Sequence, residues 1–265
     1  HDFDPNGDQI DLNELSPIDR LLLHRTAVFL ENTRGHYDAF HFRKVIECVQ
    51  QYVSNDLSSF YFEIVKDTLY TSGSHSIGRR RVQTTLHHAL GALLAVISPI
   101  IPFTAEDIYQ YQIMGIEQLR KEQCDRGQDS WLNKNDAVLI DGVYEKVPGE
   151  SLFRVLSWSP SSSNNEDDIN NMEEYAWPVM RSEKFIDNSL EKKWLPVSQL
   201  RERVQYTLEI ARKEEKAIGN SLDAKIELVG AWSEHPEATK DLMSFGSLSN
   251  IFVVSQVEFV DLDNA

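Results

Sequence analysis

Three consecutive arginines, Arg79, Arg80 and Arg81, are the most conspicuous chemical feature of a 265-residue chain whose formal net charge is −16. A guanidinium group presents planar N–H donors that pair with two oxygens of a phosphate or a carboxylate at once. The triplet could therefore bind a polyanion, or it could pair with acids of the same fold. The stretch SIGRRRVQTT (76–85) opens a predicted helix, in which successive side chains diverge by about 100°. The three arginines therefore cannot all face one ligand.

Helical geometry divides the triplet between two roles. We expect at least one of Arg79 and Arg80 to point back toward the preceding helix, where Glu63 and Asp67 supply acids, and Arg81 to face outward. Phosphate contact by the triplet is the alternative.

A second group of cations lies in the predicted helical region 192–216. Seven cations face five acids there when the preceding Glu191 is included, which gives an excess of only +2, and a solvated helix with internal ion pairs is the favoured interpretation. Trp194 follows Lys192 and Lys193, a combination suited to stacking on a nucleic-acid base, although a buried tryptophan that anchors the linker to the body of the protein is favoured. The candidate ligand-contacting residues are thus Arg79, Arg80, Arg81, Lys192, Lys193, Trp194, Arg201, Arg212 and Lys213.

The sequence contains no pattern typical of a catalytic or metal site. There is no glycine-rich phosphate loop, no G-x-S-x-G and no Cys/His cluster with zinc-ligand spacing. Cys48 and Cys124 lie far apart, which favours a reducing compartment, and the adjacent His87 and His88 diverge on a helix. We expect no catalytic residue, no bound metal and no cofactor in this chain.

The acidic charge is concentrated in two segments. Residues 1–19 carry six acids and residues 163–174 carry five, without a Lys or Arg in either segment. Without those eleven acids the remaining chain would carry −5, so a basic face elsewhere is compatible with the composition.

Hydrophobic periodicity predicts the elements that position these residues. Helices are expected over about 16–35, 38–53, 56–70 and 76–97, with Ser16 as N-cap and Ser54–Asn55–Asp56 as a break. Four helices with short connections are typical of an antiparallel bundle. SPIIPFTAEDIY (98–109) predicts a buried apolar corner and a new helix that begins at Thr104.

The last third of the chain predicts a small α/β unit. A polar linker (157–171) precedes a helix over about 197–217, two strands at 222–228 and 250–260, and a helix over 235–246 between the strands. The expected fold is mainly α: a helical bundle (1–114), an irregular excursion and linker (115–171), and a C-terminal α/β unit (172–265).

Several long segments resemble isoleucyl-tRNA synthetases, which are class I aminoacyl-tRNA synthetases. They are NDLSSFYFEIVKDTLY (55–70), GRRRVQTTLHHALGALLAVISPIIPFTAEDIY (78–109) and ARKEEKAIGNSLDAKIEL (211–228), supported by DFDP (2–5), FHFRKVIE (40–47) and VVSQVE (253–258). These segments follow one another as in the anticodon-binding region, which lies downstream of the catalytic core in these enzymes. Their residues are more similar to the bacterial or organellar form of the enzyme than to the eukaryotic cytosolic form.

The resemblance implies a tRNA-contacting part of an ATP-dependent ligase that charges tRNA(Ile) with isoleucine. The HIGH and KMSKS motifs, the editing domain and the terminal four-cysteine zinc module of that family are absent, and the chain lacks an initiator Met, so we expect a fragment of a longer protein that is itself inactive. The parent would use ATP with Mg²⁺. The expected partners are tRNA(Ile) and the missing catalytic and editing domains.

We expect a monomer without a membrane partner, located in the cytoplasm or, in a eukaryote, in an organelle. Two alternatives stay open. One is the same region of a valyl- or leucyl-tRNA synthetase, which DLSSFYF and KAIGNSLDAK disfavour. The other is a helical protein–protein adaptor, which the acidic balance would suit.

Overall fold

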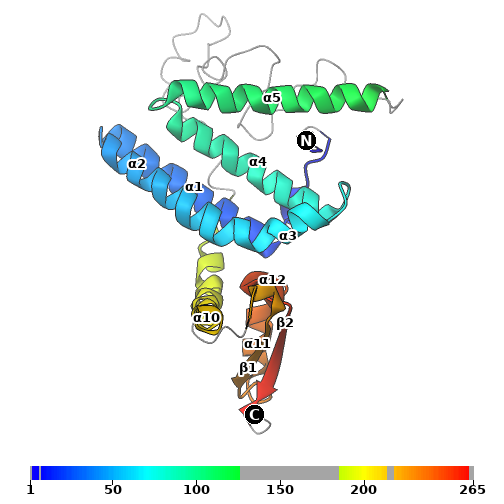
Figure 1. The fold of residues 1–265 in the computed structure, drawn as a ribbon. Coiled ribbons are helices and arrows are strands. Elements are labelled where there is room, and N and C mark those ends of the chain that lie inside the picture. The colour runs from blue at the N-terminus through cyan, green and yellow to red at the C-terminus, as the bar shows by residue number, and fades with distance from the viewer. Residues whose placement is uncertain (1, 6, 126–184, 214–217, 263–265) are drawn as a thin grey trace, which may run out of the picture.

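The computed structural model describes residues 2–5, 7–125, 185–213 and 218–262 of the chain. A bundle of long helices lies above a smaller unit that contains two strands (Figure 1). The bundle begins with the short helix η1 (Leu12–Glu14). It continues with α1 (Pro17–Asp38), α2 (Phe42–Gln51), the π-helix η2 (Tyr52–Phe62), α3 (Glu63–Thr71), α4 (Ile77–Ile97) and α5 (Pro102–Asp125). The expected mainly helical fold with a small α/β unit is confirmed.

The start of α1 is set by a capping box. Ser16 accepts a hydrogen bond from the Asp19 backbone N–H, and the Asp19 carboxylate accepts one from the Ser16 backbone N–H. The predicted start is therefore confirmed. The predicted stop at Gly35 is wrong, because the helix continues to Asp38 and ends in a turn in which Phe40 has a left-handed backbone (φ 55°).

The predicted break at residues 54–56 is also wrong, because α2, η2 and α3 form one continuous rod. The polar residues of this stretch find partners without interrupting the helix. The Ser59 hydroxyl donates to the Ser54 carbonyl, and Asp56 accepts from Arg25 of α1 at 3.1 Å. Leu57 and Phe60 are buried in the bundle core. Ser54 and Asn55 are exposed on the outer face of the amphipathic rod, and the half-buried Asp56 is paired with α1, so the apolar inner face stays intact.

Buried hydroxyl groups tie the rod to α1. The Tyr61 hydroxyl donates to Asp19 Oδ1 at 2.6 Å, and the hydroxyls of Thr26 and Tyr52 lie 2.7 Å apart. Burial raises the pKa of Tyr61 well above its usual value, with the Asp19 carboxylate adding to the shift. Tyr61 therefore stays protonated and serves as a hydrogen-bond donor inside the core.

The corner between α4 and α5 departs from the prediction. The helix α5 begins at Pro102 rather than Thr104, since proline is well suited to the first helical turn. The corner is not a buried one: Ile101 is exposed, and Phe103 is 87% exposed. From there α5 passes through residue 115 as far as Asp125, and the rest of the predicted excursion and the linker lie outside the described residues.

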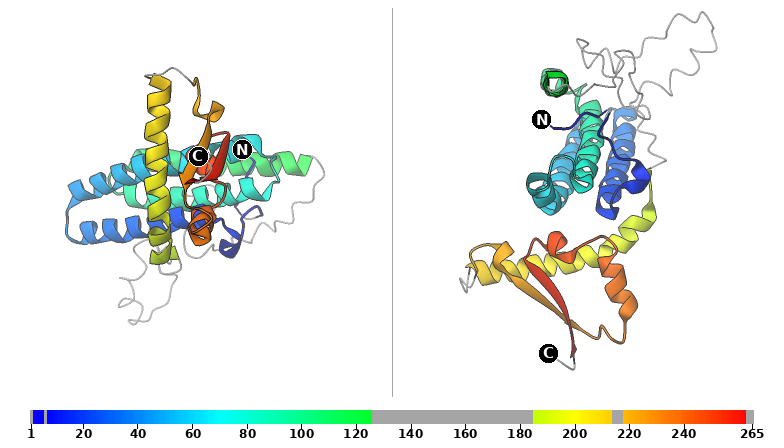
Figure 2. Two further views of the ribbon diagram at one scale, coloured as in Figure 1. Left: turned by 90° about the horizontal axis from the view of Figure 1, so that it is seen from below. Right: turned by 90° about the vertical axis from the view of Figure 1, so that its right-hand side faces the viewer.

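The C-terminal unit is built on α10 (Asn188–Lys213), which runs across the bundle helices rather than along them (Figure 2). It continues with η3 (Ser221–Asp223), β1 (Lys225–Gly230), α11 (Pro236–Met243), α12 (Leu248–Phe252) and β2 (Gln256–Asp261). The two strands pair in parallel, with Lys225 opposite Gln256 and Gly230 opposite Asp261. The first part of the predicted strand 250–260 belongs to helix α12, which ends at Phe252 and is capped by Val253 with a left-handed backbone.

The bond between Tyr61 and Asp19 predicts a stability effect. Tyr61→Phe removes the donor and leaves a buried carboxylate with one partner fewer, so the free energy of unfolding should fall by about 1.5–3 kcal/mol. The matched control Tyr70→Phe alters an exposed hydroxyl and should change it by less than about 0.5 kcal/mol. Urea denaturation measures both variants, and equal effects would contradict the role assigned to Tyr61.

Candidate nucleic-acid interface

Two members of the arginine triplet are held by acids of the same fold. Arg79 Nε donates to Asp2 Oδ2 at 2.8 Å, and its Nη1 donates to the Leu69 carbonyl. Arg80 is buried and forms an ion pair with Asp8 at 3.2 Å, while its Nη1 also donates to the backbone carbonyl of Asp2. The prediction of a structural ion pair is confirmed for both arginines.

The partners predicted for that ion pair are wrong. Glu63 and Asp67 belong to the helix that precedes α4, but the structure places Glu63 against Arg201 instead. The acidic N-terminal segment folds back onto the start of α4 and takes their place. It also hydrogen-bonds α4 further along, where the Ile10 N–H donates to Thr84 Oγ1 at 3.1 Å.

The prediction that Arg81 faces outward is also wrong. Its side chain is half-buried, and its Nε is buried without a hydrogen-bond partner among the described residues. The position one residue after Arg80 on a helix turns it away from Asp2 and Asp8. The triplet as a whole is therefore a buried or half-buried feature of the bundle rather than an exposed cationic strip.

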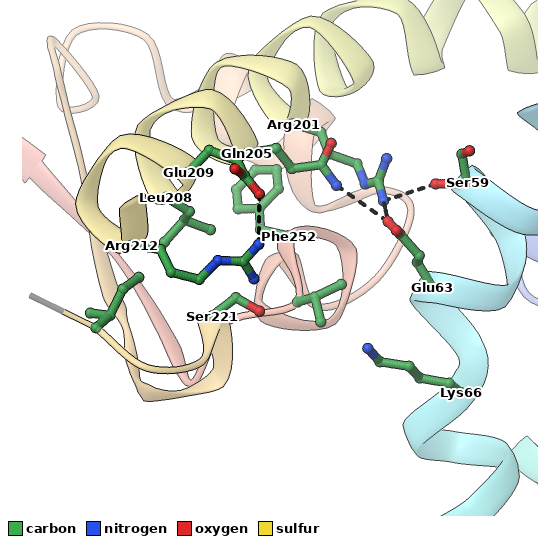
Figure 3. A pocket seen from close by; sticks show the side chains of 12 residues that line it. Ser59, Glu63, Lys66, Arg201, Gln205, Leu208, Glu209, Arg212, Ser221 and Phe252 are labelled. Carbon is green, nitrogen blue, oxygen red and sulfur yellow. Dashed lines mark hydrogen bonds and ion pairs between the residues drawn. The ribbon is translucent and has the colours of Figure 1, made fainter. Parts of the chain in front are cut away.

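Arg201 joins the bundle to the C-terminal unit. It is only 8% exposed, and it donates to the Ile251 carbonyl of α12 at 3.0 Å, to the Ser59 carbonyl of η2 at 3.2 Å and to the Glu63 carboxylate. Figure 3 shows the bonds to Ser59 and Glu63 at the edge of a cleft between α3 and α10. Because its guanidinium donates to three acceptors within the protein, Arg201 has a structural role and is not free to bind a phosphate.

The cleft beside Arg201 has a volume of about 530 Å³. Lys66 and Arg212 extend into it from opposite walls (Figure 3). Arg212 is already paired with Glu209 at 2.8 Å, and Glu63 adds a second acid to the lining. The cations of the cleft exceed its acids by only one, so it offers a weakly positive surface.

Trp194 is packed inside the protein, as the sequence favoured. It is 3% exposed, and its ring lies between Phe60 of η2 and Phe245, each with its centroid 5.1 Å away in an edge-to-face arrangement. The contact with Phe60 joins the C-terminal unit to the bundle, and the contact with Phe245 ties α10 to the segment that follows α11. A nucleic-acid base therefore has no free face of Trp194 on which to stack.

The other α10 candidates are exposed, but they lie at opposite ends of the helix. Lys192 and Lys193 are in its first turns, whereas Arg212 and Lys213 end it, and twenty helical residues span about 30 Å. Arg212 and Lys213 both pair with Glu209. The structure thus does not bring the predicted contacts into one site.

Sequence patterns alone did not point to an exposed surface at the turn between α1 and α2. The α1–α2 turn, residues 34–44, carries the exposed rings of Phe40 and Phe42 among exposed cations. A signal is present in FHFRK, where aromatic and basic residues occur together, but the helical periodicity of the same stretch is explained equally well by an apolar stripe.

In the described part of the chain, no three His, Cys, Asp or Glu side chains are placed to hold a metal ion. Within the same residues, no helix is both long and apolar enough to cross a membrane.

Comparison with known proteins identifies the class to which this architecture belongs. Residues 19–228, which include the bundle helices, α10 and the start of the C-terminal unit, match the family model described as the anticodon-binding domain of tRNA ligase. The chain belongs to this family. It is a region of an aminoacyl-tRNA ligase that does not cover the catalytic core.

Curated relatives are similar over nearly the whole chain. An isoleucine–tRNA ligase of Petrotoga mobilis is 31% identical over 99% of the chain, one of Thermosynechococcus vestitus 31% over 98%, and one of Desulforamulus reducens 30% over 97%. The chain spans 22–23% of the length of these relatives.

The internal role of Arg201 predicts unequal effects for the two ends of its ion pair. Arg201→Met keeps the apolar stem but leaves the Ile251 and Ser59 carbonyls without their donor, so stability should fall by about 2–4 kcal/mol. Glu63→Gln retains an acceptor on a side chain that is 46% exposed, and should cost less than about 1 kcal/mol. Arg203→Met on the exposed side of α10 is the control. Equal losses for Arg201→Met and Arg203→Met in urea denaturation would refute the internal role.

The contacts of Asp2 predict a dependence of stability on pH. Burial by itself raises the pKa of Asp2, but hydrogen bonds from Arg79 and Gln83 and the charges of Arg79 and Arg80 lower it below its usual 3.8. A lowered pKa in the folded state means that Asp2 stabilises the fold above pH 3.8 and loses this contribution as the pH falls through the folded pKa.

The stability difference between the wild type and Asp2→Asn should therefore shrink as the pH is lowered below 3.8. Asp67→Asn, which removes an exposed carboxylate of α3, corrects for the change in net charge. Thermal unfolding measured between about pH 3 and about pH 6 makes the comparison. A difference that stays constant over this range would contradict the assignment.

Proposed function

We propose that the chain is the anticodon-binding part of an isoleucine–tRNA ligase, the enzyme that uses ATP to join isoleucine to tRNA(Ile). The observation that carries the proposal is similarity to isoleucine–tRNA ligases over 97–99% of the chain. The ligation chemistry, with ATP and Mg²⁺, then belongs to the catalytic part of the parent protein. The role of this region is to hold tRNA by its anticodon arm.

The cations best suited to phosphate contact are exposed ones that are not used in ion pairs or hydrogen bonds within the fold. Arg79, Arg80 and Arg201 are used internally, and Arg212 and Lys213 share Glu209. Lys192 and Lys193 are exposed at the start of α10, beside the junction with the bundle. We assign phosphate contact chiefly to this pair and a weaker contribution to Arg212 and Lys213.

Binding of labelled tRNA(Ile) at several salt concentrations tests the proposal. Affinity should fall steeply with salt, and it should fall when the anticodon is changed. Lys192→Gln with Lys193→Gln should weaken binding and reduce the slope of log K against log salt by about 0.7 for each phosphate that is no longer neutralised. Lys240→Gln, an exposed lysine on α11, is the control that should leave the slope unchanged.

Binding that ignored both salt and anticodon would refute the proposal and favour a protein–protein adaptor. Preference for a valine or leucine tRNA over tRNA(Ile) would instead move the assignment to a related ligase. A wild-type slope in the Lys192/Lys193 variant would leave tRNA binding intact but contradict the pair assigned to phosphate.

A further inference from the structure

The α1–α2 turn combines an unfavourable backbone with an exposed aromatic side chain. The turn closes α1 with two hydrogen bonds, from the Phe40 N–H to the Tyr37 carbonyl (2.9 Å) and from the His41 N–H to the His36 carbonyl (2.8 Å). This is the Schellman arrangement, in which the residue at the position of Phe40 has a left-handed backbone, and glycine is preferred there. Phe40 has φ 55° and is 78% exposed.

A phenylalanine at this position contributes little to the fold. A residue with a β-carbon is disfavoured in the left-handed region, and a ring that is mostly exposed gains little from burial. Bulky residues held in such conformations cluster at ligand-binding positions. The observation therefore points to a ligand for the ring rather than to a structural role.

The surroundings of Phe40 restrict the chemistry of that ligand. Its ring meets the half-exposed ring of Phe42 edge to face, with centroids 6.2 Å apart, and Phe42 meets Tyr37 in the same way at 6.0 Å. Tyr37 is fixed to α4, because its hydroxyl donates to the Val96 carbonyl at 2.7 Å. Phe40 therefore packs on Phe42, which packs on Tyr37, and Tyr37 is held in place by its hydrogen bond to α4.

Cations frame the aromatic surface. Within residues 34–44, Arg34, Arg43 and Lys44 are exposed and face a single acid, Asp38, so the α1–α2 turn is positive in a chain of net charge −16. Arg43 pairs with Glu47 at 3.0 Å, one helical turn away, but remains largely exposed. On the neighbouring α4–α5 corner, at the same end of the bundle (Figure 1), the exposed side chains Ile101 and Phe103 are apolar.

We propose that the α1–α2 turn is a stacking platform for an unpaired base of the bound tRNA, with Phe40 against the base and Arg34, Arg43 and Lys44 near the flanking phosphates. Exposed aromatic rings beside cations are the usual means by which proteins hold single-stranded nucleic acid. This inference rests on the proposed function, because it names the part of the surface that meets unpaired nucleotides.

Phe40→Gly separates the role of the ring from that of the backbone. Glycine suits the left-handed position, so the melting temperature should stay the same or rise. Affinity for tRNA(Ile) should fall about tenfold, which corresponds to ~1.4 kcal/mol, as expected for the loss of one stacked base. The salt slope should not change, because the ring carries no charge.

Two further variants control for nonspecific effects. Phe40→Tyr keeps a stacking ring and should retain wild-type affinity. Tyr70→Ala removes a ring that is equally exposed, but at the other end of the α2–η2–α3 rod, and should also bind as the wild type does. An anticodon stem-loop with 2-aminopurine at successive unpaired positions reports the stacked base directly. Its fluorescence should be quenched by the wild type at one position and not by Phe40→Gly.

The outcomes separate the stacking platform from the proposed function. If the wild type binds tRNA(Ile) with a steep salt dependence but Phe40→Gly binds equally tightly, the stacking platform is refuted and the proposed function stands. If the wild type does not bind tRNA(Ile), both the stacking platform and the proposed function are refuted. A loss of affinity in Tyr70→Ala equal to that in Phe40→Gly would also overturn the assignment of the α1–α2 turn.

Discussion

The arrangement of the two parts of this protein depends on the need of one buried guanidinium for acceptors. Arg201 is almost fully buried, and a buried charge is tolerated only when its donors are satisfied. Its acceptors come from η2, α3 and α12, so they are available only when α10 crosses the bundle and α12 packs beneath it.

Arg25 adds a second link between the bundle and α10, because it pairs with Asp56 of the rod and with Glu191 of α10. The packing of Trp194 against Phe60 adds an apolar contact at the same junction. The position of the C-terminal unit is thus fixed by directional bonds as well as by apolar contact.

The same interactions decide which cations remain for RNA. Arginine is well suited to bidentate pairing, and this fold uses Arg25, Arg79, Arg80 and Arg201 to bind its own acids and carbonyls. Among the exposed cations outside these pairs are those at the start of α10 and in the α1–α2 turn. A count of basic residues along the sequence therefore overstates the phosphate-binding surface, because it cannot separate an arginine that faces water from one that holds two helices together.

Local signals in the sequence predicted local structure well, and failed where partners are distant. The capping box at Ser16 and Asp19 lies within one turn of helix and was predicted correctly at its N-cap. The partner of Arg79 lies 77 residues away in an N-terminal segment without periodicity, so proximity in sequence points to the wrong acids. Polar residue types predict a break at residues 54–56, but a hydroxyl bonded to the backbone and a distant arginine keep that stretch helical. The role of Phe40 escapes prediction for a similar reason, because neither its backbone angle nor its exposure follows from residue type.

A net charge of −16 and a polyanionic partner are compatible because charge acts over a short range in solution. At physiological ionic strength the screening length is about 8 Å, so a phosphate responds to the few side chains near it rather than to the whole protein. In the N-terminal segment, Asp2 and Asp8 are neutralised by Arg79 and Arg80. The acidic composition therefore limits nonspecific attraction to nucleic acid, and it leaves specific binding to surfaces where an aromatic ring and a few uncommitted cations occur together.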